Sequence, residues 1–594
     1  MASPITNTHV HIFTGDHVPK YIAKKILPWP LYYLTHVHVI VDIFKWWKKH
    51  ERKLDGLRLT REKTLGNIKS CWISWIAYSL LVGLLLINSL YFILDYFGAI
   101  KAFTEWISPH LANNLGQIGE LFLLPLSTPS QQIAVIIITT LLSSNARKLI
   151  WHLLSFFITP LKLLKSEQLS FYQRYLDILE FTKLGKSSTI FNKLKKMYPD
   201  DSQFVVLPMD MEYMGAGSTK ESYLVQLDEL NKLFYSEDSN DRISTTKTDL
   251  QYKKQLLPFI FVDPRRIIEK GGKAFFDYEI TTEGDIELRE CLLKKYLVKE
   301  KGDPTRGNFC GIKIYPALGY YPSHRGLLPL WRFCAQEGIP ITTHTTIGSM
   351  YYRGLIKKKW FKHPIFRNSN NSDFILARST NRDLQINFSH PLNYLGLLEP
   401  KFLHAYLKRL NDEEINKVFG ITEDGNYTKS LCSLKINFAH FGGTEQWTNF
   451  IKEDRNQEIL RMTSGEKRSL NFFYDKEDEK DNPLGKPAWL WSNQKVDWFS
   501  VIISLMRQYD GVYADISYIL HDTDLMPLIQ QIMKDEVIKK RVLFGTDFYV
   551  VRNHKSEKEL VYDWSHGLDQ KTLDLIARKN PKDFLNQKSL DNKC

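Results

Sequence analysis

Cysteine is scarce in this chain of 594 residues: its six cysteines are scattered, and no two of them form a C-x-x-C pair. This spacing indicates neither a disulfide framework nor a thiolate zinc site, and it fits a reducing compartment. The N-terminus lacks the cationic start and the long apolar stretch of a secretory signal, so we expect a protein that is not secreted. No internal repeat or low-complexity tract is present either.

Acidic residues are outnumbered by basic ones, 66 against 79, which gives a formal net charge of +13. A basic balance of this size is typical of proteins that meet nucleic acid, an anionic membrane surface or an anionic substrate. The sequence has no zinc-finger pattern, basic helix or interleaving of aromatic and basic residues, and it therefore predicts no nucleic-acid partner. Apolar residues make up 43% of the chain, which is enough for a large folded core.

Two long stretches near the N-terminus contain no charged residue. The first, residues 70–94, is dense in Leu, Ile and aromatic residues and is long enough to cross a hydrocarbon core of about 30 Å, so it predicts a transmembrane helix over about residues 70–97. The second, residues 121–146, is interrupted by Pro125 and Pro129. It predicts a second membrane helix over about residues 131–158, with a re-entrant or buried helix as the alternative.

The charges around these stretches predict an orientation. Nine Lys and Arg residues lie between positions 45 and 69, four lie between positions 147 and 165, and the loop at 98–120 carries only three charged residues. The two predicted membrane helices and the short loop between them would form a hairpin in the membrane, and by the positive-inside rule both ends of this hairpin face the cytoplasm. We therefore expect a multi-pass membrane protein with the lipid bilayer as a partner and the soluble part on the cytoplasmic side. Much of the net charge is then membrane-surface charge.

Beyond residue 200, short apolar runs each end in a polar residue and lead into loop or helical sequence, as in parallel α/β folds. With the run at the N-terminus there are eight, which predicts a (β/α)8 (TIM) barrel whose site gathers at the carboxyl ends of its strands. A ninth run, residues 386–390, is interpreted as a hairpin or loop insertion. The eight runs are ITNTHVHIF near the N-terminus, FVVLPMD ending at Asp210, LPFIFVD at Asp263, CGIKIYP around Lys313, IPITTH at His344, LKINFAH at His440, GVYADIS around Asp515 and VLFGTD at Asp547.

Histidines gather at the ends of these runs. Side chains alternate along a strand, so His9 and His11 lie on one face and point toward one place. Imidazole nitrogen and carboxylate oxygen are ligands that zinc and similar cations accept, and a catalytic site needs three or four of them with an open position for water. His344 and His440 end two later runs, and Asp547 ends the last. Their joint position at strand ends predicts a metal site.

Six segments carry further information: NTHVHIF, GIKIYPALGYYP, PITTHTTIG, INFAHFGG, VYADIS and VLFGTDF. Together they resemble the strand ends of the amidohydrolase superfamily, in the amidohydrolase-related branch that includes aminocarboxymuconate semialdehyde decarboxylase. The resemblance covers residues 6–13 and roughly residues 204–548. It implies a distorted (β/α)8 barrel and a role for His440 in polarising water or substrate. It also implies one divalent metal ion held by His9, His11, His344 and Asp547.

A bound divalent cation lowers the pKa of its water toward 7 and polarises a carbonyl, which supports hydrolysis of an amide, ester or lactone. In this interpretation Asp547 takes the water proton and passes it to the leaving group, while His440 stabilises developing negative charge or relays a proton. Zinc is the first candidate for the metal, with manganese or iron as alternatives. Two other functions stay open: non-oxidative decarboxylation of a small carboxylic acid, and a membrane scaffold that has lost activity.

Lys313 has two interpretations. Some superfamily members carry a carbamylated lysine on the fourth strand that bridges two metal ions, and Lys313, His344 and His440 stand at the matching positions. The favoured interpretation is an uncarbamylated Lys313 that either binds an anionic group of the substrate, because a lysine is an effective point charge for a carboxylate, or fixes the packing of the barrel.

Three further residues are predicted to bind substrate. Tyr320, Tyr321 and Arg353 lie on loops after the fourth and fifth strands, where substrate is normally recognised. The expected substrate is a small molecule that is anionic or membrane-soluble. Asp515, on the seventh strand, is predicted either to touch substrate or to orient a metal ligand by a hydrogen bond.

The connection after the first strand is unusual. About 190 residues separate His11 from the next predicted strand, far more than the 2 to 6 residues usual for such a loop. Because the first strand carries two ligands, it must lie on the same side of any bilayer as the other strands, so the insertion crosses a bilayer either twice or not at all. We therefore expect the first barrel strand in residues 1–16, an inserted helical region with the membrane hairpin in residues 17–200, and the rest of the barrel in residues 201–594. The oligomeric state is left open.

Overall fold

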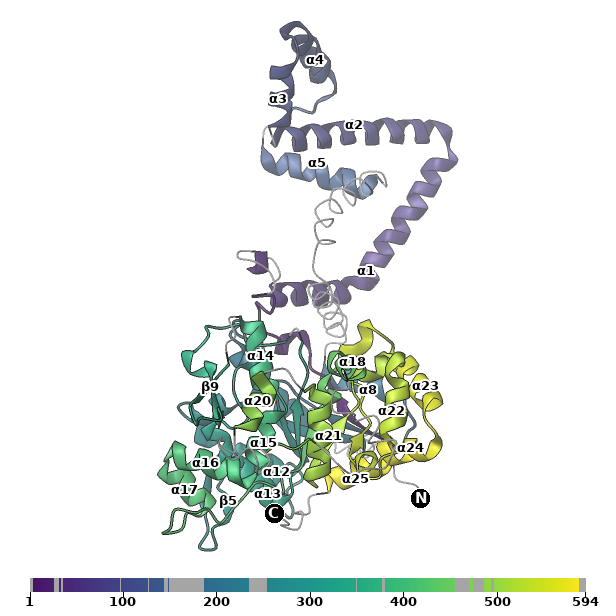
Figure 1. The fold of residues 1–594 in the computed structure, drawn as a ribbon. Coiled ribbons are helices and arrows are strands. Elements are labelled where there is room, and N and C mark those ends of the chain that lie inside the picture. The colour runs from purple at the N-terminus through teal and green to yellow at the C-terminus, as the bar shows by residue number, and fades with distance from the viewer. Residues whose placement is uncertain are drawn as a thin grey trace. The chain divides into compact units, whose positions relative to one another are not determined.

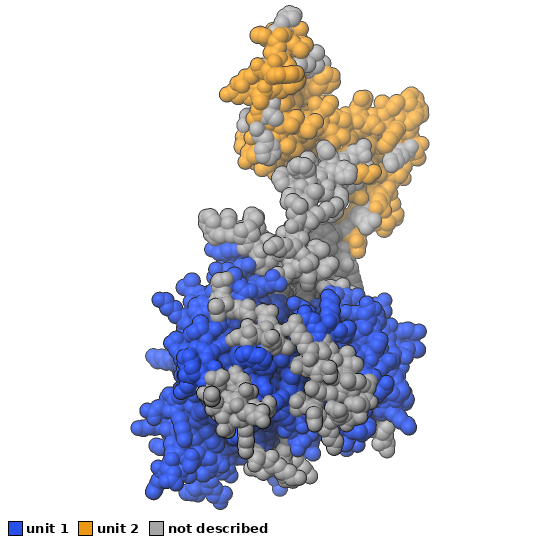
Figure 2. Space-filling view, viewed as in Figure 1, with its two compact units in different colours: residues 1–45, 171–594 blue, residues 46–170 orange. Residues whose placement is uncertain are grey.

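A computed structural model of the chain consists of two compact units (Figure 2), one of residues 1–45 and 171–594 and the other of residues 46–170. Both division points lie inside the insertion predicted over residues 17–200, so the barrel unit also contains the segment that follows the first strand. The structure describes residues 4–25, 31–33, 36–96, 98–126, 128–143, 148, 186–233, 254–348, 350–376, 380–453, 470–473, 485–492 and 496–586.

Eight parallel strands form a nearly closed barrel in the first unit, in the order β1-β2-β3-β6-β7-β10-β11-β12. They coincide with the eight predicted runs, so the α/β barrel is confirmed. The barrel closes between β12 and β1, where the amide of Thr8 donates to the carbonyl of Phe544 (2.8 Å) and the amide of His11 to that of Phe548 (2.6 Å). The strands are β1 (Thr6–Val10), β2 (Gln203–Val206), β3 (Leu256–Phe261), β6 (Gly311–Ile314), β7 (Ile341–His344), β10 (Ile436–Ala439), β11 (Val512–Asp515) and β12 (Val542–Leu543).

The register brings the carboxyl ends of the strands to one rim. Ile436 of β10 pairs with Ile341 of β7 and with Val512 of β11, and Ala439 pairs with His344. Residues of β10 are buried throughout, as expected for a parallel strand covered on both faces. Polar residues that follow the apolar runs therefore gather at the same rim, which is where (β/α)8 barrels carry their sites.

Helices surround the strands of the first unit (Figure 1). Their ends follow ordinary capping rules: Asp497 accepts a hydrogen bond from the amide of Ser500 (2.7 Å) at the start of α21, and α13 ends at Gly338, whose φ of 64° suits glycine. The helices are α8 (Ser187–Lys195), α9 (Tyr223–Lys232), α11 (Pro264–Ile268), α12 (Leu292–Leu297), α13 (Leu328–Glu337), α14 (Asn381–Ser389), α15 (Leu392–Leu398), α16 (Pro400–Leu410), α17 (Glu413–Phe419), α18 (Thr444–Glu453), α20 (Lys486–Ser492), α21 (Trp498–Gln508), α22 (Met526–Ile532), α23 (Glu557–Gly567), α24 (Gln570–Asp574) and α25 (Asn580–Leu585).

The long interval between β7 and β10 holds helices and one small hairpin. The expectation of a hairpin or loop over residues 386–390 is wrong, because most of this run belongs to α14. The hydroxyl of Thr380 accepts a hydrogen bond from the amide of Asp383 (3.1 Å) and caps the helix, and the buried Leu384 and Phe388, four residues apart, lie on one helical face. Two antiparallel hairpins stand apart from the barrel: β4 (Tyr278–Ile280) with β5 (Ile286–Leu288), and β8 (Lys362–Arg367) with β9 (Asp373–Ile375).

The second unit is a set of helices in which α2 and α5 pack side by side (Figure 1). Polar groups join the two helices: the hydroxyl of Ser89 donates to that of Thr139 (2.9 Å), and the hydroxyl of Tyr78 donates to the carbonyl of Leu142 (2.7 Å). These bonds satisfy polar groups inside an otherwise apolar contact. The helices are α1 (Val37–Ser70), which begins in the first unit, α2 (Trp72–Tyr96), α3 (Ala99–Trp106), α4 (Pro109–Phe122) and α5 (Pro129–Leu142).

Among the described helices, α2 is the one that is long and apolar enough to cross a membrane. It covers the stretch predicted over about residues 70–97, and many of its large apolar side chains are exposed, including Trp72 (72%) and Leu80 (69%). Helix α5 covers the first part of the second predicted span and has 14 residues. Most of the rest of that span, up to residue 158, lies outside the described residues.

Candidate metal centre

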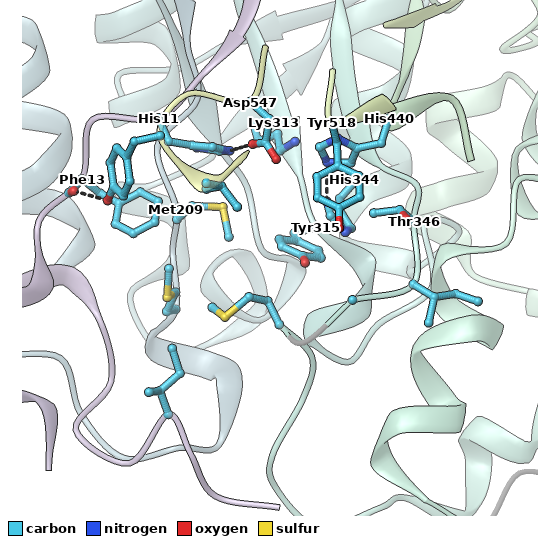
Figure 3. Close-up of a pocket in the computed structure, with 17 residues that line it drawn as sticks. His11, Phe13, Met209, Lys313, Tyr315, His344, Thr346, His440, Tyr518 and Asp547 are labelled. Carbon is cyan, nitrogen blue, oxygen red and sulfur yellow. Dashed lines mark hydrogen bonds and ion pairs between the residues drawn. The ribbon is translucent and has the colours of Figure 1, made fainter. Parts of the chain in front are cut away.

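Seven polar side chains meet at the carboxyl rim of the barrel, although they come from six different strands. Figure 3 shows His11, Asp547, Lys313 and His440 along one edge of a cavity, with His344 close to His440. The set joins every predicted metal ligand and both predicted catalytic residues. Its members are His9 in β1 and His11 just after it, Lys313 in β6, His344 at the end of β7, His440 after β10, Asp515 at the end of β11 and Asp547 after β12.

Asp547 lies between the two histidines of the first strand. Its Oδ1 atom is 3.3 Å from Nε2 of His11 and 3.7 Å from Nε2 of His9. Two ligand atoms on one tetrahedral zinc ion lie roughly 3.3 Å apart, given metal–ligand distances of about 2.0–2.2 Å. The separations of these three side chains therefore fit common ligation of one metal ion.

The contacts of the two Nδ1 atoms indicate that the Nε2 lone pairs of both histidines are directed at Asp547. Nδ1 of His9 donates to Oδ2 of Asp515 (3.1 Å), and Nδ1 of His11 donates to the carbonyl of Leu207 (2.7 Å). A neutral imidazole that donates from Nδ1 keeps its lone pair on Nε2. A lone pair that faces a buried carboxylate oxygen repels it unless a cation lies between them. Such a partner bond on the far nitrogen is also what orients histidine ligands in metal sites.

His440 extends the group toward the fifth strand. Ligand atoms of His9, His440 and Asp547 all lie within 4.8 Å of one another, so these three buried residues could hold a metal ion. Nδ1 of His440 lies 2.9 Å from the hydroxyl of Ser517, and its Nε2 lies 3.1 Å from Nδ1 of His344. Nε2 of His344 is buried without a hydrogen-bond partner among the described residues. The predicted ligand His344 therefore contacts this group through its hydrogen bond with His440.

Asp515 holds this constellation in place. Its Oδ2 accepts hydrogen bonds from Nδ1 of His9 (3.1 Å) and from the side-chain amide of Asn437 (2.7 Å). Its Oδ1 accepts hydrogen bonds from the backbone amides of His440 and Ser517 (3.1 Å each). The hydroxyl of Ser517 donates to the same Oδ1. One fully buried carboxylate therefore fixes residues of β1, β10 and β11 relative to one another. Of the two roles predicted for Asp515, the contacts are those of orienting a ligand.

Burial sets the protonation states. It lowers the pKa values of His9 and His344 and brings that of His440 to about 3, so all three are neutral at pH 7. Burial by itself would raise the pKa of Asp547, but its contact with Nε2 of His11 and the nearby imidazoles of His440 and His9 outweigh burial and hold that pKa below its usual range. The same balance, with His9 as the main partner, keeps Asp515 ionised.

Lys313 is the one cation in this group. It is 1% exposed, its ammonium has no hydrogen-bond partner among the described residues, and burial lowers its pKa to about 8. With Asp515 and Asp547 ionised and Lys313 protonated, these three buried side chains together carry one negative charge in excess. A buried excess charge is costly unless it is paired, so the site as a whole favours a bound cation.

The backbone around the site is strained. Among the described residues, seven that are not glycine have positive φ, and four of them belong to this site: His440 (65°), Phe441 (44°), Tyr518 (65°) and Asp547 (58°). Each such residue costs of order 1–3 kcal/mol, and strain of this kind is typical of functional sites.

A glycine allows the close approach of two strands beside His9. A Cβ atom on Gly545 would lie 2.9 Å from the Cβ of His9 and 3.2 Å from that of Ser517. The glycine of the VLFGTD run is therefore required by packing rather than by its backbone angles, and it lets Asp547 lie against the first strand.

A cavity opens from this group and is lined mainly by apolar side chains. It contains about 910 Å³ of empty space, part of which is open to solvent. The aromatic residues Phe13, Tyr315, Tyr518 and Tyr549 line it, and the ring of Tyr315 packs against that of His344 with ring centroids 3.8 Å apart and an interplanar angle of 33°. Sequence reasoning did not find these aromatic residues, because apolar lining residues carry no pattern that separates them from the core. The aliphatic part of the lining consists of Ile22, Met209, Met211, Ile347, Met350 and Val550.

Of the four predicted substrate-binding residues, Lys313 lines the cavity and the other three do not. The hydroxyl of Tyr320 donates to the carbonyl of Val262 (3.3 Å) and accepts from the amide of Tyr315 (3.0 Å). The hydroxyl of Tyr321 donates to the carbonyl of Trp360 (3.0 Å). The third, fully buried Arg353, has its guanidinium 3.7 Å from the ring centroid of Tyr351.

A comparison with protein-family models finds no match, and a comparison with curated proteins finds none either.

Proposed function

We propose that this chain is a membrane-tethered, metal-dependent hydrolase of the amidohydrolase superfamily that cleaves an amide, ester or lactone bond. The observation that carries the proposal is the convergence of His9, His11, His440 and Asp547, with lone pairs and a carboxylate directed at one place, at the rim where such barrels carry their chemistry. His344 adds its Nε2 atom, which has no hydrogen-bond partner in the part of the chain that the structure describes.

The chemistry divides among the side chains. When bound, a divalent cation lowers the pKa of water toward 7 and polarises a carbonyl oxygen. Asp547, ionised at neutral pH, accepts a proton from water and delivers it to the leaving group. His440 donates to or accepts from the reacting oxygen, with its other nitrogen held by Ser517. Lys313 adds positive charge where the oxygen of the carbonyl becomes an oxyanion, or where an anionic group of the substrate binds.

We propose one ion per chain, with zinc as the first candidate because imidazole and carboxylate are its usual ligands, and with manganese or iron as alternatives. The ligands would be His9, His11, His344 and Asp547, and His440 would lie beside the ion. A second ion would require a carbamylated Lys313. Nζ of Lys313 has no hydrogen-bond partner among the described residues, which is compatible with either form of the side chain, so the number of ions must be measured.

We further propose that α2 and a second segment that begins with α5 form a hairpin in the bilayer, with the barrel on the cytoplasmic side. The exposed apolar side chains of α2 and the apolar contact between α2 and α5 support this. The excess of basic residues at both ends of the hairpin gives the sidedness. Protein that stays with membranes at high salt and in alkaline carbonate, and that leaves them only in detergent, is the expected result. Release by salt alone would replace the hairpin with peripheral attachment.

A screen of metal-loaded protein tests the reaction. Esters, lactones, amides and small carboxylic acids are offered in water enriched in ¹⁸O, and both ¹⁸O in the product and released carbon dioxide are measured. We expect ¹⁸O in a carboxylate product and no carbon dioxide. Carbon dioxide without ¹⁸O would instead identify a decarboxylase, and neither reaction in metal-loaded protein would favour a scaffold.

Two variants connect turnover to the site. Asp547→Asn should abolish turnover with only partial loss of metal, because an amide cannot accept the water proton. Asp263→Asn is the matched control, since Asp263 is an equally buried carboxylate that pairs with Arg265 and lies outside the site. Full activity in Asp547→Asn would refute the mechanism.

A further inference from the structure

The cavity at the metal centre is polar at one end and apolar along the rest of its wall. Figure 3 shows His11, Asp547 and Lys313 at the polar edge, with Phe13 and Met209 to one side. Aromatic side chains and six aliphatic side chains line most of the remainder. Of these, Ile22, Met209 and Met211 are almost completely buried, whereas Ile347, Met350 and Val550 are half-buried. The aliphatic wall therefore continues from the interior to the part of the cavity that is open to solvent.

This wall offers few partners for polar groups of a ligand. The hydroxyl of Tyr549 donates to the backbone carbonyl of Phe13 (2.6 Å), so that bond satisfies its proton within the protein. A ligand with polar groups along its whole length would leave them unpaired there, at a cost of about 1–3 kcal/mol for each group. A flexible hydrocarbon chain has no such cost, and methionine side chains adapt to varied apolar shapes.

The segment that supplies part of this wall also leads to the apolar helices. Phe13 and Ile22 lie in the segment that follows β1. In the same segment the backbone carbonyl of Lys20 accepts a hydrogen bond from the amide of Val37, the first residue of α1 (3.1 Å). Along the chain α1 is followed by α2, whose apolar side chains are largely exposed. Amphiphiles with a long hydrocarbon chain partition into the same apolar surroundings that such a helix requires.

We propose that the substrate is an amphiphile in which a single aliphatic acyl chain is joined to a polar group by an ester or amide bond. This bond is placed among His11, His440 and Asp547. The chain lies along Ile22, Met209 and Met211. This inference rests on the proposed hydrolase function. In the reaction the water oxygen bonds to the carbonyl carbon, the bond from that carbon to oxygen or nitrogen breaks, and a water proton goes to the leaving group. The products are a fatty carboxylate and an alcohol or amine.

The test is a chain-length series on zinc-loaded, full-length protein in amphipol, which adds no bilayer that the ligand can enter. The substrates are 4-nitrophenyl esters from acetate to decanoate, with 4-nitrophenyl benzoate as an aromatic comparison. We expect kcat/KM to rise about fourfold for each methylene until the cavity is filled, because burying one methylene contributes about 0.8 kcal/mol. A flat series, or faster turnover of the benzoate than of an ester of similar size, would overturn the inference and leave the hydrolase intact.

Narrowing the cavity should change the chain-length preference. Ile22→Trp should lower the ratio of octanoate to acetate turnover at least tenfold. Ile375→Trp, at a position on β9 that is 53% exposed, is the control that should leave the ratio unchanged. An unchanged ratio in Ile22→Trp would contradict the assignment of the chain to this wall.

Binding separates this inference from the hydrolase proposal. Displacement of a fluorescent fatty acid by decanoate, with acetate as the control ligand, is measured in wild-type protein and in the His9→Ala/His11→Ala variant. We expect decanoate to displace the probe from both proteins and acetate from neither. Displacement without turnover of any ester would support the chain site and count against hydrolysis. Turnover of an ester without displacement of the probe would support hydrolysis and count against the chain site.

Discussion

Replacing Asp515 with asparagine should weaken metal binding although Asp515 is not a proposed ligand. The carboxylate accepts hydrogen bonds from His9, Asn437, Ser517 and the amide of His440. An asparagine of the same shape has one acceptor oxygen and one NH₂ group, so at least one donor now faces another donor. If the NH₂ group takes the place of Oδ2, it lies against the amide of Asn437, 2.7 Å away in the wild-type contact, and against Nδ1 of His9.

The magnitude follows from what the bond to His9 does. Removing the partner that orients a histidine ligand typically costs 10- to 100-fold in metal affinity, which corresponds to about 1.4–2.7 kcal/mol. Each buried donor left without a partner costs a further 1–3 kcal/mol of folding stability. Asp515→Asn should therefore lower both the zinc affinity and the melting temperature. Loss of stability alone would not identify a role at the metal.

Competition with a chromophoric zinc chelator measures the affinity in detergent, and thermal unfolding is followed in parallel. Asp263→Asn serves as the control, because it removes a buried ion pair with Arg265 at a site that carries no metal. We expect it to lose stability and keep its zinc affinity. An Asp515→Asn protein whose zinc dissociation constant stays within twofold of wild type, while its melting temperature falls, would refute the reasoning.

Two further predictions use residues around the centre. Gly545→Ala should reduce the zinc content, because the added Cβ would lie 2.9 Å from the Cβ of His9. Gly443→Ala cannot serve as the control, because its added Cβ would collide with Thr346, which lines the cavity. A normal zinc content in Gly545→Ala would show that the contact between the new Cβ and His9 is easily relieved. Burial raises the pKa of Glu557 from 4.5 to about 7, so its protonated form is favoured by folding and the stability it adds is complete below pH 4.5 and lost as pH rises to 7 and above. At 1.36 kcal/mol per pKa unit, the folded protein loses about 3 kcal/mol of stability when Glu557 ionises. Glutamine does not ionise, so Glu557→Gln should have a higher melting temperature than the wild type at pH 8 but not at pH 5. Equal melting temperatures at pH 8 would contradict the raised pKa of Glu557.

The barrel and the side chains that gather at its candidate metal centre could be predicted because the relevant signals are local. Parallel strands are buried on both faces and are therefore continuous apolar runs, and their chemistry follows directly at the carboxyl ends, as at His344 and His440. The alternation that places His9 and His11 together also needs only two residues of spacing. None of these signals depends on knowing which distant segments meet.

Other features depend on contacts between distant parts of the chain. The hydroxyl of Ser517 meets Nδ1 of His9 across 508 residues of sequence, and no local pattern marks that pair. Tyr320 and Tyr321 follow a strand end as substrate-binding residues often do, but their hydroxyl groups satisfy buried backbone atoms. The run at residues 386–390 has a strand-like composition, and it is helical because the cap at Thr380 and tertiary packing decide its conformation.

The metal content per chain decides whether the residues at the rim of the barrel bind a metal ion. Elemental mass spectrometry is applied to detergent-purified wild-type protein and to the His9→Ala/His11→Ala variant, both after reconstitution with zinc, manganese or iron. We expect about one ion per wild-type chain and none in the variant. About two ions would assign Lys313 to a carbamylated bridge, and no ion in the wild-type protein would contradict the metal centre and with it the proposed hydrolase.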